Sequence, residues 1–142
     1  MSSSDETTTI LVYSDDGETR EKIRLAIGRR PAADLPRVDY VECATEPAVL
    51  TALEKKPVDV AVLDGEAWPA GGMGICRQAK DEIYQCPPFV VIVGRREDGW
   101  LATWSRADAV TTHPIEPVAL AEAVGGLVRQ RREASTGPPV RR

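Results

Sequence analysis

The segment Val58-Asp59-Val60-Ala61-Val62-Leu63-Asp64 determines the fold that we expect for this chain. Its second half is an unbroken apolar run, which is typical of a strand buried on both faces, and the run ends at a carboxylate. Residues 9–14 and 89–93 have the same apolar character. Strands buried on both faces occur in parallel sheets covered by helices on each side, so these runs predict an α/β domain.

Signals for strands and helices alternate five times along the chain. Gly28 and Pro31 end a first helical segment, Thr45 can cap a second, and Pro117 suits the first turn of the last. The alternation predicts a doubly wound, five-stranded parallel sheet with helices on both faces. We expect strands at 9–14, 38–43, 58–63, 89–93 and 108–112, and helices within 18–28, 45–53, 73–83, 98–106 and 117–128.

Length and composition indicate one domain of ordinary globular character. The chain has 142 residues, 42% hydrophobic and 28% charged, which is enough for one well-buried core. We expect the folded part to cover residues 8–132, between a flexible tail at 1–7 and a flexible basic tail at 133–142. The three cysteines show no metal-ligand spacing, so we expect reduced thiols and not a disulfide framework or a zinc site.

Charge and hydropathy limit the cellular environment and the kinds of partner that we expect for this chain. The formal net charge of −4 argues against broad nucleic-acid binding. The longest apolar run, residues 89–93, is far too short to cross a bilayer, and the polar N-terminus lacks a signal-peptide pattern. We therefore expect a cytoplasmic protein that does not insert into the membrane and that reaches it, if at all, through another protein.

Two carboxylates, Asp15 and Asp64, follow two apolar strands that this topology places side by side. The carboxyl ends of parallel strands meet at one edge of the sheet, where ligands collect. Carboxylates at such an edge repel each other unless they share a cation, a proton or donors, which favours a magnesium site. The alternative, about equally supported, is that each carboxylate only caps the loop or helix that follows it.

The segments around Asp15 and Asp64, and others along the chain, resemble the receiver domains of bacterial response regulators. Ile10 to Asp15, followed by Arg20, is similar to their acidic opening, and Val58 to Asp64 is similar to their third strand, which ends in the phosphoacceptor aspartate. Asp108 to Pro114 resembles their fifth strand and Lys-Pro pair. The resemblance covers about residues 8–130 and implies a flavodoxin-like sheet of order 2-1-3-4-5. A flavin-binding enzyme with the same topology is a further functional alternative, but the chain lacks a phosphate-binding loop.

The resemblance implies that Asp64 accepts a phosphoryl group from a histidine kinase. It also implies that Asp15, Asp64 and a carbonyl near Glu66 hold Mg²⁺. The chain departs from the family at three places: Ser14 replaces the first acid, Val93 or Gly94 stands where a hydroxyl belongs, and His113 replaces the lysine. These losses predict weak Mg²⁺ binding, no required cofactor and a largely vestigial phosphorylation site. The alternative is a working receiver phosphorylated at Asp64.

The expected role is therefore protein contact and not catalysis. The chain ends soon after its last predicted helix, so we expect a stand-alone receiver without an output domain. Three tryptophans are the expected partner-binding residues: Trp68 lies in the loop after Asp64, and Trp100 and Trp104 share a helix face. We expect one of the helical pair to be packed in the core and the other exposed.

The chain also resembles a particular group of orphan receivers. The segments 30–36, 64–67 and 71–75 are similar to stretches of actinobacterial receivers associated with the respiratory NADH:quinone oxidoreductase, complex I. That resemblance implies an accessory or regulatory subunit on the cytoplasmic arm of the complex.

Overall fold

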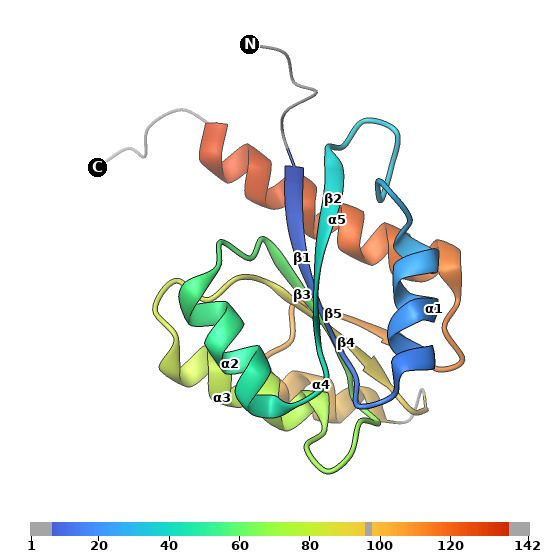
Figure 1. Cartoon of the computed structure of the whole chain (residues 1–142), viewed down its shortest axis with the longest axis vertical. Coiled ribbons are helices and arrows are strands. Elements are labelled where there is room, and N and C mark those ends of the chain that lie inside the picture. The colour runs from blue at the N-terminus through green and yellow to red at the C-terminus, as the bar shows by residue number, and fades with distance from the viewer. Residues whose placement is uncertain (1–6, 96–97, 137–142) are drawn as a thin grey trace.

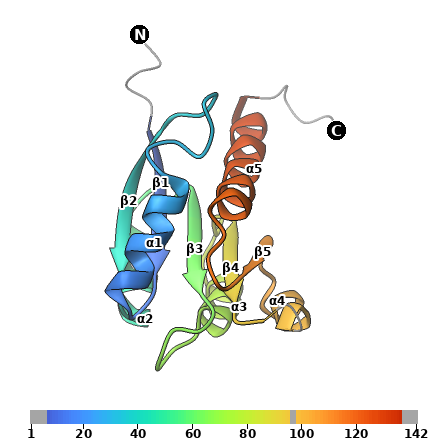
Figure 2. The ribbon, with the colours of Figure 1, turned by 90° about the vertical axis from the view of Figure 1, so that its right-hand side faces the viewer.

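The computed structural model describes residues 7–95 and 98–136 of the 142-residue chain, and the outer parts of both expected tails lie outside these ranges. Five parallel strands form one sheet in the order β2-β1-β3-β4-β5, which confirms the predicted doubly wound topology (Figures 1 and 2). The strands are β1 Thr7–Tyr13, β2 Arg37–Cys43, β3 Val60–Asp64, β4 Phe89–Val93 and β5 Ala109–Thr112.

The three central strands form the middle of the core, as their apolar runs predict. Every residue of β3 and β4 is buried, and so is β1 from Ile10 onward. Alternate residues face opposite sides of the sheet. Leu11 and Leu63 therefore belong to one apolar cluster, whereas Val12 and Val62 belong to the other. The sheet separates two cores, each of which needs its own layer of helices.

Helices cover both faces, as Figure 2 shows. α1 and α5 lie against one face and contact each other; α2 and α3 lie against the other. The helices are α1 Gly17–Ile27, α2 Glu46–Lys55, α3 Gly72–Glu82, α4 Gly99–Ser105 and α5 Pro117–Thr136.

Local sequence signals explain several helix boundaries. The Thr45 side chain accepts from the Ala48 amide at 3.2 Å and caps α2 as predicted. Gly28, with φ of +76°, ends α1 in a conformation that favours glycine. Ile83 follows α3 and is not part of it. α5 continues to Thr136, four residues beyond the expected end of the domain at residue 132, because no helix-breaking residue intervenes.

The parallel topology brings the carboxyl ends of the strands to one side of the sheet, toward the lower half of the molecule in Figure 1. The loops that follow β1, β3 and β4 meet there, and these loops carry Asp15, Glu66, Trp68 and Gly94. Among the described residues, no helix combines the length and the hydropathy that crossing a bilayer requires.

Candidate functional site

Asp64 lies at the centre of the site, at the last position of β3, and only 4% of its surface is exposed. Three donors reach its carboxylate. The Ser14 hydroxyl donates to Oδ2 at 2.8 Å, and the Glu66 amide donates to Oδ1 at 2.9 Å. His113 Nε2 also lies 2.9 Å from Oδ1. Because an ionised carboxylate only accepts, this geometry places a proton on Nε2.

These contacts nearly saturate the carboxylate. An ionised Asp offers about four lone-pair positions, and protein donors fill three of them here. The Glu66 amide contact is a loop cap, the alternative that sequence patterns left open for this residue. His113 makes two contacts at the strand end: its ring lies against Asp64, and its amide donates to the Val93 carbonyl at 2.8 Å.

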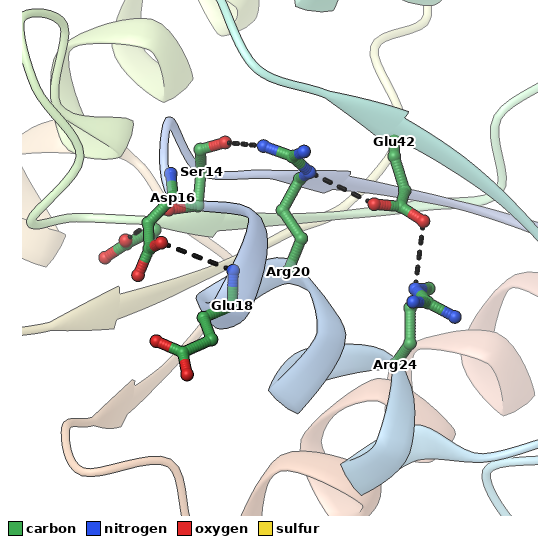
Figure 3. Close-up of polar contacts among 7 residues, drawn as sticks. Ser14, Asp16, Glu18, Arg20, Arg24 and Glu42 are labelled. Atoms are coloured by element: carbon green, nitrogen blue, oxygen red, sulfur yellow. Dashed lines mark hydrogen bonds and ion pairs between the residues drawn. The ribbon is translucent and has the colours of Figure 1, made fainter.

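Ser14 is completely buried and is held by its own neighbours as well as by Asp64. Its hydroxyl accepts from the Asp16 amide at 3.1 Å, and its carbonyl accepts from Arg20 Nη1 at 2.7 Å. Figure 3 shows that Arg20 also forms an ion pair with Glu42 of β2, and that Glu42 pairs with Arg24 as well. Ser14, which stands where the family has an acid, is thus held in a hydrogen-bonded network. That network contains no buried carboxylate besides Asp64.

The two acidic residues that follow β1 have different roles. Asp16 begins α1: it accepts from the Glu18 amide at 3.3 Å and from the Thr19 hydroxyl at 2.8 Å. The Thr19 hydrogen bond is the main reason why the pKa of Asp16 lies below its usual value. Asp15 does not cap this helix. Its carboxylate instead accepts from the Trp68 amide at 2.9 Å and so fixes the loop after β3.

The end of β4 settles which residue faces the site. The Val93 side chain is fully buried in the core, so Gly94 occupies the position of the missing hydroxyl. The carboxylate of Glu66 lies over Gly94: a Cβ added there would approach Glu66 Cδ to 2.5 Å. Glu66 therefore covers the place where a side chain of residue 94 would otherwise project.

Tyr13 fixes the far part of the same loop. Its hydroxyl donates to the Ala70 carbonyl, 57 positions along the chain. Burial, followed by the nearby charges of Asp15, Glu46 and Asp64, raises the pKa of Tyr13. A neutral hydroxyl is the form that can donate, so these effects preserve the contact.

Comparison with known proteins identifies the family. An uncharacterised response regulatory protein of Mycobacterium tuberculosis, present in two strains, is 51% identical over 120 residues, covering 84% of this chain and 90% of the relative. The chain belongs to the response regulator family. No family model matches it.

Solved structures place the fold among receiver domains. A CheY-like response regulator receiver domain protein from Methanospirillum hungatei superposes with a TM-score of 0.71 at 17% identity, covering 91% of this chain and 99% of that one. A response regulator receiver protein from Pseudomonas putida gives 0.71 at 17% identity, covering 85% and 98%. At such identities the likeness establishes the receiver fold and leaves the site to be judged from its own geometry.

The residues expected to hold Mg²⁺ are Asp15, Asp64 and Glu66, and the receiver brings them to one edge but directs them differently. Asp15 accepts from the loop, Asp64 accepts from three donors, and Glu66 lies over Gly94. Within residues 7–95 and 98–136, no three His, Cys, Asp or Glu side chains are grouped closely enough to hold a metal ion. Chelation would therefore require side chains to leave their present partners.

All three tryptophans are exposed, and the expectation that one of the helical pair is core is wrong. Trp68 is 75% exposed, Trp100 68% and Trp104 48%. Arg77 of α3 explains the partial cover of Trp104: its guanidinium lies 4.8 Å from the ring centroid, and Nη1 donates to the Trp104 carbonyl at 2.6 Å. The short α4 thus presents aromatic surface outward on the receiver.

The sequence did not reveal two parts of this site. The apolar run at residues 9–14 predicts Tyr13 only as part of a buried strand, although its hydroxyl donates to the Ala70 carbonyl. No sequence pattern marks the Glu42 carboxylate, which joins Arg20 to Arg24. Arg20, five residues after Asp15, was the available signal, because a cation beside an acidic pair needs a carboxylate or carbonyl partner.

Proposed function

We propose that this receiver acts as an adaptor that binds a protein partner without phosphorylation of Asp64. One observation carries the proposal: the Asp64 carboxylate is buried and already accepts from Ser14, Glu66 and His113. An aspartate that accepts a phosphoryl group needs free lone pairs directed at the incoming phosphorus, and it needs a cation to offset the added charge. Here protein donors occupy three of the about four lone-pair positions.

Phosphorylation would cost interactions that this site does not replace. Hydrogen bonds to a charged group contribute about 1.5–3 kcal/mol each, and transfer to Asp64 would break at least the bond made by the attacking oxygen. Ser14 adds no charge for a metal, and Gly94 offers no hydroxyl to the new phosphoryl oxygens. His113 has a shorter side chain than lysine, and its Nε2 is already directed at Asp64. These losses favour a structural role, in which Asp64 holds the loops at the strand ends through its hydrogen bonds.

The exposed tryptophans supply the contact surface of the proposed adaptor. Trp100 and Trp104 lie on α4, and Trp68 lies on the loop that Asp15 fixes. Tryptophan is enriched among the residues that dominate binding energy at protein interfaces. A role through contact needs no catalytic chemistry, in keeping with receivers as regulatory domains and not enzymes.

The proposed partner is the cytoplasmic arm of the respiratory NADH:quinone oxidoreductase, which places the receiver at the inner membrane through a protein complex. This assignment rests on the resemblance of segments 30–36, 64–67 and 71–75 to receivers associated with that complex. The receiver would act there as an accessory or regulatory subunit.

Affinity purification from native cells tests the proposal. Tagged wild-type protein and Asp64→Asn should recover equal, stoichiometric amounts of respiratory-complex subunits, as read by quantitative mass spectrometry. Trp100→Ala/Trp104→Ala should recover at least about fivefold less, because two large apolar anchors are lost. Tyr84→Ala, which removes another highly exposed aromatic side chain, is the matched control and should behave as wild type.

The second candidate is a receiver that a histidine kinase phosphorylates at Asp64. It is favoured by the retention of Asp64 at the end of β3 and of Asp15 at the same edge. In the same purification, this candidate predicts recovery of a histidine kinase, or of a partner that is lost with Asp64→Asn. Either result would overturn the adaptor proposal.

A further inference from the structure

The outer edge of β2 has no neighbouring strand among the described residues. β2 is the end strand of the sheet, and β1 is its only neighbour among the described residues. Figure 1 shows β2 at the front of the molecule, between α1 and α2. An unpaired strand edge offers backbone donors and acceptors to another extended chain.

The direction of the free backbone groups follows from the register. In a parallel sheet, successive residues direct their backbone groups to alternate sides of the strand. Cys43 points inward, because its carbonyl accepts from the Ser14 amide at 3.3 Å. Val38 points outward, because its amide donates to the Arg29 carbonyl at 2.8 Å. Tyr40 and Glu42 therefore also turn their amides and carbonyls outward.

A cationic groove lies on the α1 side of this edge. It has a volume of about 390 Å³. Three arginines line it, Arg24, Arg29 and Arg37, together with Leu25 and Tyr40 and without any carboxylate. No ion pair is found for Arg29 or Arg37 within the described ranges. The nearest acid of β2, Glu42, already pairs with Arg20 and Arg24 (Figure 3). The groove is thus suited to acidic side chains.

A different groove, of about 520 Å³, lies on the α2 side of the same strand. Five of its nine lining residues are apolar, Val41 and Cys43 of β2 and Pro47, Ala48 and Ala52 of α2; the others are Glu42, Thr51, Lys55 and Lys56. The apolar residues of this lining can pack against apolar side chains of a bound segment.

We infer that the β2 edge binds an extended segment of a protein partner in which acidic and apolar residues alternate. Added as a sixth strand, the segment pairs its backbone with Tyr40 and Glu42. Its acidic side chains then face the arginine groove, and its apolar side chains face the α2 groove, because successive residues alternate between faces. The inference rests on the proposed adaptor role and assigns the chemistry of one partner segment.

An NMR titration of the full chain tests the inference. The probe is a synthetic peptide of about seven residues, the length of β2, that alternates Glu and Val. The expected result is saturable shifts of the Tyr40 and Glu42 amides, which weaken as salt is raised. A peptide that alternates Lys and Val should bind at least about tenfold more weakly. Equal binding of both peptides, or no shift at β2, would overturn the inference.

Charge reversal supplies the matched variants. Arg29→Glu/Arg37→Glu should weaken binding of the Glu-Val peptide at least about tenfold. Arg95→Glu/Arg106→Glu makes the same change in net charge at exposed positions away from this groove and should leave binding unchanged. Loss of binding in both variants would assign the effect to net charge and contradict the inference. Because the titration uses purified protein and peptide, its failure is separate from failure to recover the respiratory complex.

Discussion

The strand-end site and the surface around α4 have opposite character. At the strand ends, Asp64 is 4% exposed and accepts from three protein donors. On α4, Trp100 and Trp104 are 68% and 48% exposed, and only Trp104 has a described cation–π partner, Arg77. The buried carboxylate at the strand ends is hydrogen-bonded by the protein itself, whereas the two large aromatic side chains of α4 face solvent. This contrast is the basis of the proposal that the carboxylate has a structural role and that the aromatic surface binds a partner.

The largest expected effect comes from removing the Asp64 carboxylate. Asp64→Ala leaves the buried Ser14 hydroxyl, the Glu66 amide and the His113 ring without an acceptor, so we expect a loss of about 3 kcal/mol in the free energy of unfolding. Asp64→Asn keeps one acceptor oxygen and should lose roughly half as much. Urea unfolding measures both. Asp81→Ala, at an exposed surface ion pair, is the control and should stay within about 0.5 kcal/mol of wild type. A neutral Asp64→Ala would contradict a structural role.

Restoring an acid at residue 14 should make the site depend on magnesium. Ser14→Asp places a second carboxylate beside Asp64 in a buried position, so without metal we expect a loss of about 2 kcal/mol in the free energy of unfolding. Millimolar Mg²⁺ should recover part of that loss, as read from the thermal midpoint, and should shift the wild-type midpoint much less. An equal Mg²⁺ shift in both proteins would show that the wild-type site already binds the ion.

The α4 tryptophans should affect stability less than Asp64 does. Trp100→Ala removes a mostly exposed side chain and should change the free energy of unfolding by less than about 0.5 kcal/mol. Trp104→Ala also removes the Arg77 contact and should cost about 0.5–1 kcal/mol. Urea unfolding checks both values. A loss above about 2 kcal/mol for Trp100→Ala would mean that this residue is a core residue.

The smallest expected effect is at Gly94. In Gly94→Ser the new Cβ meets only the end of the exposed Glu66 side chain, which can turn away. We expect a change of less than about 0.5 kcal/mol in the free energy of unfolding, measured by urea denaturation. A larger loss would show that the position of Glu66 over Gly94 is a stabilising contact and not a consequence of available space.

The parts that sequence patterns predict well are those set by local chemistry. The apolar runs of β1, β3 and β4 place these strands in the interior, and Thr45 caps α2 as expected. The hydrogen-bond partners of Asp64 could not be predicted from local sequence patterns. Two of its three donors, Ser14 and His113, lie 50 and 49 positions away, so only the folded topology shows that they fill its lone pairs.

Sequence patterns also fail to predict which side chains are exposed. The four-residue spacing of Trp100 and Trp104 establishes a shared helix face but not whether that face is inward or outward. Likewise, sequence left Val93 and Gly94 as alternatives for one position. The burial of the Val93 side chain, a result of the β4 register, decides between them.

The most direct test of this account is the intact mass of the receiver after incubation with acetyl phosphate and Mg²⁺. The account predicts that the wild-type protein stays unmodified, and that the combined variant Ser14→Asp/Gly94→Ser/His113→Lys gains one phosphoryl group on Asp64. Stoichiometric phosphorylation of wild-type Asp64, lost in Asp64→Asn, would contradict the structural role of this carboxylate and would establish a phosphorylation switch.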